Sequence, residues 1–132
     1  MMVPVKHMEE SLNFFHEKFK VYPIWLCPFR VFNRPGLLKI HSNAESEAYV
    51  NIGLYGIAKT KGYEAVKSTR RFEQFVIEHQ GFQMLYADIY SSEEEFRQMY
   101  DHTLYDKMRD TLPHCKEAFP VLFGKVNKKA RR

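Results

Sequence analysis

The chain of 132 residues lacks the features that mark several specialised classes of protein. It has no run of about eighteen apolar residues, so we expect no membrane-spanning helix within it. Its first residues, Met1 to His7, lack the basic start and apolar stretch of a secretory signal. Its two cysteines, Cys27 and Cys115, are far apart and form neither a CxxC pair nor a disulfide framework. A reduced, intracellular protein is the expectation.

Motifs for nucleotides and metals are also missing. The six glycines form no Gly-rich phosphate loop, so the pattern predicts no nucleotide site within the chain and leaves any cofactor-binding residues unknown. The six histidines show neither an HExxH motif nor paired-ligand spacing, so we expect no metal site.

Aromatic residues, by contrast, are abundant. Eleven Phe, eight Tyr and one Trp make up 15% of a chain that is 45% apolar and 27% charged, a composition typical of a globular domain. The net charge is +4, and much of the excess lies between Lys125 and Arg132. We expect one domain over 1–120 and a basic C-terminal tail over 121–132, which is expected to be frayed from Lys125 onward.

Hydrophobic periodicity predicts the order helix, strand, strand, helix, strand, helix. The expected helices cover 5–19, 63–79 and 91–112, and the expected strands cover 22–32, 48–55 and 82–90, with a polar loop over 33–47. Gly81 is expected to end the second helix in the left-handed region. A capping box, Ser91 with Glu94 or Ser92 with Glu95, is expected to start the third. The pattern indicates an α+β domain with an antiparallel sheet and helices on one face.

Alternation along these strands predicts one aliphatic face and one aromatic face with polar tips. Three helices suffice to cover the aliphatic face, and nothing obvious remains for the other. We therefore interpret the aromatic face as closing over a ligand, a second domain or another subunit. Two alternatives stay open: a loop folds across the sheet, or these residues only satisfy strand propensity. The face comprises Trp25, Phe29, Tyr49, Asn51, Tyr55, Phe82, Met84 and Tyr86.

Three stretches carry a family resemblance. Residues 21–29 (VYPIWLCPF), 51–56 (NIGLYG) and 79–88 (HQGFQMLYAD) resemble the C-terminal part of the 24-dehydrocholesterol reductases, or delta(24)-sterol reductases. The closing segments 118–120 and 128–131 are similar as well, so the resemblance covers nearly the whole chain. Departures occur at Asn51, where the family tends to have Asp, at Ile57-Ala58, which replaces Glu-Pro, and over 121–126.

The resemblance implies a flavoprotein of the FAD-linked oxidase superfamily that uses NADPH to reduce the Δ24 double bond of sterol side chains in sterol biosynthesis. Such enzymes carry an N-terminal membrane anchor, an FAD-binding domain and a substrate cap domain. This chain resembles the ferredoxin-like cap and the tail only, so FAD would be bound mainly by a domain absent from it. The family implies the endoplasmic reticulum membrane, whereas this chain alone is expected to be soluble, cytoplasmic and inactive.

Reduction of an isolated alkene needs a proton donor and a dry, oriented pocket, because the flavin supplies only the hydride. We expect Tyr86 to be the proton donor and Asp88 to support it. Tyr86 could instead only pack, since a phenol is a weak acid, and Asp88 could be a structural acceptor. The sterol is expected to contact Trp25, Phe29, Tyr49, Asn51, Tyr55, Phe82 and Met84.

Two other functions remain open. A truncated cap could act as a non-catalytic binding module. A basic domain with aromatic residues on its sheet could also stack nucleic-acid bases. The aromatic face, however, offers Asn51 and Asp88 rather than Lys or Arg, so we expect no nucleic-acid partner.

Overall fold

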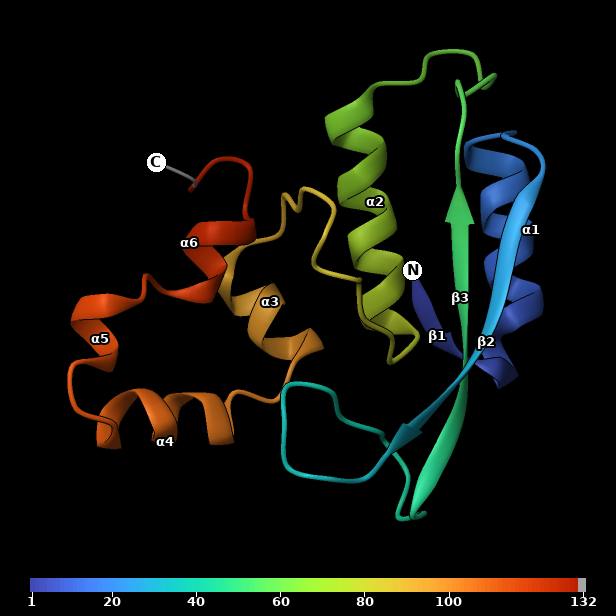
Figure 1. Cartoon of the computed structure of the whole chain (residues 1–132). Helices are drawn as coiled ribbons and strands as arrows, with labels where there is room; N and C mark the ends of the chain where they lie inside the picture. The colour runs from blue at the N-terminus through green and yellow to red at the C-terminus, as the bar shows by residue number, and fades with distance from the viewer. Residues whose placement is uncertain (131–132) are drawn as a thin grey trace.

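The computed structural model describes residues 1–130 and contains a three-stranded antiparallel sheet. Strand β3 (Ser46–Leu54) lies in the middle, between β1 (Met2–Pro4) and β2 (Ile24–Phe32), as Figure 1 shows. The register places Val3 of β1 and Pro28 of β2 opposite Val50. The predicted α+β class with an antiparallel sheet is confirmed.

The helices form two groups. A 3-10 turn, η1 (Val5–His7), leads into α1 (Met8–Lys18), and α2 (Ala65–Glu78) lies beside α1, because Phe14 of α1 stacks on Phe75 of α2 at 4.4 Å between ring centroids. The second group follows α2 in the chain and forms a lobe beside it (Figure 1). It comprises α3 (Glu93–Met99), α4 (Thr103–Thr111), α5 (Cys115–Ala118) and α6 (Leu122–Val126).

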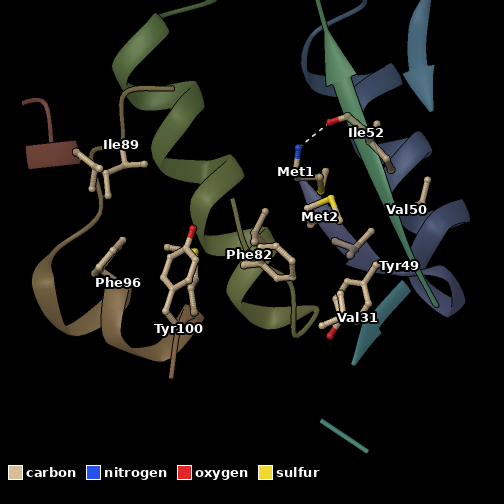
Figure 2. Close-up of a cluster of buried hydrophobic side chains, with 14 of the residues drawn as sticks. Met1, Met2, Val31, Tyr49, Val50, Ile52, Phe82, Ile89, Phe96 and Tyr100 are labelled. Atoms are coloured by element: carbon tan, nitrogen blue, oxygen red, sulfur yellow. Dashed lines mark hydrogen bonds between the residues drawn. The ribbon is translucent and has the colours of Figure 1, made fainter. Parts of the chain in front are cut away.

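The core extends to both faces of β3. Val50 and Ile52 are buried on one face, and Tyr49, whose side chain points to the other, is also fully buried. From Tyr49 a line of rings runs through Phe82 and Tyr100 to Phe96 of α3, with successive centroids 5.6, 6.3 and 4.7 Å apart. Figure 2 shows this line leading from the sheet to α3. The prediction that nothing covers the aromatic face is therefore wrong for this half of the sheet.

The strand expected over 82–90 does not form. Phe82 and Ile89 each make only one isolated bridge, the first to Met2 and the second to Asn127. Beyond Phe82 the Gln83 carbonyl accepts the Tyr100 hydroxyl, a side chain, instead of a strand amide. The third strand is instead β1, whose three residues are too few to show a periodicity.

Gly81 does not adopt the left-handed conformation that was expected. Gln80 takes it instead, with φ of 56°. At Gly81 the nearest backbone is so close that an added Cβ would lie 2.4 Å from the Met2 carbonyl oxygen. The glycine therefore permits the close approach of this segment to β1 rather than the reversal of the chain.

The single helix expected over 91–112 is two helices. The capping box is the Ser92–Glu95 pair, with both reciprocal hydrogen bonds present. The helix then breaks after Met99, where Tyr100 turns into the core and the Asp101 carboxylate accepts the amide of Thr103 to start α4.

The C-terminal segment is anchored rather than frayed as far as residue 130. Helix α6 occupies 122–126, and Val126 and Asn127 are buried. The Asn127 amide donates to the Ser91 carbonyl, and Lys128 pairs with Asp88 at 2.9 Å. The last residues of the expected basic tail, 131 and 132, lie outside the described part of the chain.

Candidate functional site

A cleft of about 330 Å³ lies between the end of β3, the two helices α1 and α2, and the segment 83–88. Its walls are largely apolar, with Phe15 of α1, Phe19 directly after α1, Phe72 of α2 and Ile52 of β3. This volume lies in the range of small-molecule pockets, which are typically apolar with a few polar groups. The polar side chains that line it are those of Tyr55, Thr69, Gln83, Tyr86 and Asp88.

The cleft brings the two predicted catalytic residues together. Tyr86 and Asp88 both line it, and so does Tyr55, which directly follows β3. Tyr55 and Tyr86 are each 74% exposed, so both phenols are open to a ligand and to solvent. Asp88 is half-buried and pairs with Lys128, which links the cleft to the C-terminal segment.

Gln83 is a polar residue of the cleft that the sequence analysis missed. It is buried, yet no donor among the described residues reaches its side-chain oxygen Oε1. A buried acceptor without a partner costs free energy unless a ligand or water satisfies it. Alternation along the expected strand places Gln83 with Leu85 and Ala87 on the aliphatic face. A polar residue on that face was the one sign in the sequence that Gln83 could have a special role.

The α-amino group of Met1 lies beside the cleft. The Met1 nitrogen donates to the Ile52 carbonyl at 2.6 Å, and Met1 lines the cleft. Burial lowers the pKa of this amino group from 8.0 to about 5. It is therefore uncharged at neutral pH, which keeps this wall of the cleft apolar.

Beside the cleft, aromatic side chains remain exposed on β2. Trp25 and Phe29 are 57% and 47% exposed. Trp25 lies opposite Gly53 in the register. A Cβ added at Gly53 would lie 3.6 Å from the Trp25 Cβ and 3.5 Å from the Tyr55 ring, so both side chains flank this glycine. We call Trp25, Phe29 and Tyr55 the aromatic surface.

The remaining predicted contacts divide into two groups. Met84 is exposed and Asn51 is half-buried, so both stay within reach of a ligand. Tyr49 and Phe82 are at most 2% exposed and pack on each other in the core, which leaves them no surface for a substrate. Burial also raises the pKa of Tyr49 to about 12, so its phenol stays neutral. Their predicted role as substrate contacts is corrected to a role in packing, because the two rings are buried against each other and Tyr100, which follows α3, packs on Phe82.

Within the described residues, no helix combines the length and the apolar character needed to cross a membrane. Comparison with protein-family models finds no match, and no solved structure matches either.

Curated sequences do match. The chain is 46% identical to the Delta(24)-sterol reductase of Homo sapiens and 47% identical to that of Mus musculus, in each case over 99% of its length. It is 43% identical over its full length to a Delta(24)-sterol reductase homolog of Caenorhabditis elegans. It spans about a quarter of the length of each of these relatives. Along its whole length, therefore, this chain is homologous to about a quarter of the delta(24)-sterol reductases that it matches.

Proposed function

We propose that this chain forms the substrate wall of a flavin-dependent delta(24)-sterol reductase, the portion that closes over the sterol side chain. The observation that carries the proposal is the cleft, in which Tyr55, Tyr86 and Asp88 meet an apolar wall beside the exposed aromatic surface. An unsaturated hydrocarbon chain fits such a lining, because it offers no polar group that would need a partner.

Tyr86 is the proposed proton donor. Its phenol gives its proton to the less substituted carbon of the double bond, which leaves a tertiary cation on the neighbouring carbon. Aromatic faces such as those of Trp25 and Tyr55 stabilise a developing cation without adding fixed charge. Because Tyr86 is largely exposed, its phenolate regains a proton from water after each turnover. Asp88, held by Lys128, supports the position of this segment.

Reduced flavin would supply the hydride that completes the reaction, and NADPH would reduce the oxidised flavin again. Among the described residues, those that line the cleft include no Lys or Arg, so the cleft fits an uncharged ring edge or hydrocarbon and not the pyrophosphate of FAD. We assign the phosphates of FAD, and the attachment to the endoplasmic reticulum membrane, to the part of the relatives that this chain does not span.

A hybrid enzyme tests this function. In it, this chain replaces the matching quarter of the Mus musculus relative, and reduction of a Δ24 sterol and the amount of bound FAD are both measured. We expect the hybrid to bind FAD and to reduce the side chain. A hybrid that is folded and carries FAD but does not reduce the sterol would contradict the proposed function.

The Tyr86→Phe variant of this hybrid tests the proton donor separately. Loss of a general acid typically lowers turnover by about 10² to 10⁴-fold, so we expect kcat to fall by at least 10²-fold while FAD content and KM stay close to the parent values. Tyr63→Phe is the matched control, because Tyr63 is an exposed tyrosine outside the cleft. Unchanged kcat in Tyr86→Phe would remove the acid role from Tyr86 and leave the reductase assignment standing.

A further inference from the structure

Three side chains that commonly bind metals meet where α2 ends beside the start of α1. His7 of η1, Glu10 of α1 and His79, which follows α2, place one ligand atom each within 4.8 Å of one another. Glu10 Oε2 lies 3.2 Å from His7 Nδ1 and 3.0 Å from His79 Nε2. Figure 1 shows the start of α1 and the end of α2 at the same end of the molecule.

Hydrogen bonding determines which nitrogen of His79 carries a proton. Its Nδ1 lies 2.8 Å from the Phe75 carbonyl oxygen, which can only accept, so Nδ1 is the donor. In the neutral ring Nε2 then carries the lone pair, and it faces the Glu10 carboxylate, which is also only an acceptor. Two acceptor atoms at 3.0 Å need either a proton or a metal ion between them.

The surroundings favour the metal ion. A ligating histidine usually donates its other ring N–H to a carbonyl or carboxylate, and His79 makes this bond to Phe75. Its ring is also fixed by stacking on Phe75 at 3.9 Å. Two imidazoles and one carboxylate are a known zinc ligand set, which leaves the fourth position to water. Glu10 is largely exposed, so water can reach that position.

We propose that His7, Glu10 and His79 form a binding site for Zn²⁺. The ion ties the start of α1 to the end of α2, the two helices that already meet through Phe14 and Phe75. It lies apart from the cleft, since none of the three ligands lines that cleft. The sequence gives no sign of this site, because His79 is far from His7 and Glu10 along the chain.

A second His–Glu pair offers an internal control. His114 Nδ1 and Glu117 Oε2 lie 2.9 Å apart with the same i, i+3 spacing as His7 and Glu10. Within the part of the chain that the structure describes, this pair has no third ligand near it. The pair His114–Glu117 therefore has the same two residue types as His7–Glu10 but lacks a third ligand corresponding to His79.

The experiment uses the full 132-residue chain with no affinity tag. Co²⁺ is added first, because its visible absorption reports tetrahedral coordination, and Zn²⁺ is then added to displace it. We expect one Co²⁺ per chain, displacement by one Zn²⁺, and a rise in Tm of about 5 °C or more at saturating Zn²⁺, since an ion that binds only the folded state stabilises it.

Variants identify the ligands. Glu10→Gln and His79→Gln are each expected to weaken Zn²⁺ binding at least tenfold, whereas His114→Gln should bind as the parent does. Glu10 is exposed, so Glu10→Gln keeps the test valid even where His79→Gln lowers stability by disturbing the stack on Phe75. Absence of a one-to-one complex in the parent chain, or parental affinity in either variant, would overturn the proposal. A proton between His79 and Glu10 would then account for their contact.

Discussion

At the scale of single residues, Gly81 shows how the absence of a side chain can decide a fold. An added Cβ would lie 2.4 Å from the Met2 carbonyl oxygen. Met2 is the residue of β1 that bridges to Phe82, directly after Gly81. We expect Gly81→Ala to lower the free energy of unfolding by about 1–3 kcal/mol, because the segment must move away from β1.

Gly124 provides the control for this substitution. It lies in α6 and has nothing within 4 Å of an added Cβ. Gly124→Ala should therefore raise stability by roughly 0.5–1 kcal/mol, the difference in helix propensity. Urea denaturation of both variants measures these effects. Equal stability in Gly81→Ala and the parent chain would refute the close approach.

The Met1 amino group makes stability depend on pH. Its pKa is about 5 in the folded chain and 8.0 for an ordinary exposed amino group, as in the unfolded chain. Between pH 5 and pH 8 the unfolded chain therefore binds more protons than the folded chain. Stability therefore rises as pH increases from 5 to 8, and the contribution is at most roughly 4 kcal/mol. Urea denaturation at pH 5 and pH 8.5 should show this increase.

N-terminal acetylation separates the amino group from other titrating groups. Burial also lowers the pKa of His41, which changes stability in the same direction, but His41 is present in both forms of the chain. The acetylated chain should lose only the part of the pH dependence that belongs to Met1. The same pH dependence in both forms would show that the amino group is not buried.

At the scale of elements, an ion network joins α2 to α3. Arg70 donates to Glu73 and to Glu95 at 2.7 Å each, and the bond to Glu95 is the main cause that lowers the pKa of Glu95 to about 2. Glu73 is fully buried and its other oxygen accepts the Tyr90 amide at 2.6 Å. The Glu73 carboxylate thus positions Arg70 for its bond to Glu95 of α3 and also holds Tyr90, in the segment that leads into α3.

Removal of Glu73 should therefore be costly. We expect Glu73→Ala to lower the free energy of unfolding by about 3–5 kcal/mol, because it leaves the Tyr90 amide and one side of Arg70 without a partner. Glu64→Ala is the control, since Glu64 pairs with Lys67 on the surface at 3.9 Å and should cost no more than about 1 kcal/mol. Similar urea midpoints for the two variants would contradict the network.

At the scale of the whole molecule, β2 is an edge strand that exposes apolar side chains. It pairs with β3 alone in the described sheet. Four of its large side chains are about half exposed: Trp25, Leu26, Phe29 and Phe32. Edges of this kind readily pair with another chain. We therefore expect the isolated chain to self-associate through β2.

Light scattering after size-exclusion chromatography tests this association. Phe29→Lys should weaken it about tenfold or more and leave Tm nearly unchanged, because Phe29 is largely exposed. Phe119→Lys removes another exposed phenylalanine, after α5, and should have little effect. A monomeric parent chain, or equal effects of the two substitutions, would show that β2 is not the contact.

Much of the fold was predictable where a local pattern was strong. The helices α1 and α2 and the strands β2 and β3 each carry enough residues for their period to be seen, and their expected ranges are confirmed within a few residues. The segment 82–90 has the same alternation, but a hydroxyl from Tyr100 takes the Gln83 carbonyl and the strand does not form. Alternation reports preference, and hydrogen-bond partners from elsewhere in the chain decide the outcome.

The candidate site was predictable to a similar extent. Tyr55, Tyr86 and Asp88 were expected near one another and do line one cleft. Tyr49 and Phe82 were expected on an open face, but they are buried against each other, and Tyr100 packs on Phe82. Gln83 was missed because the assumed strand pointed it at the helices.

The sequence by itself determined the α+β class, the long elements and the likeness to the delta(24)-sterol reductases, because these rest on local periodicity and on residue identity over continuous stretches. Only the tertiary structure decided which aromatic residues stay exposed, and that Glu10 meets His79. Burial and ligand geometry depend on segments far apart in the chain, and their packing has no local signature.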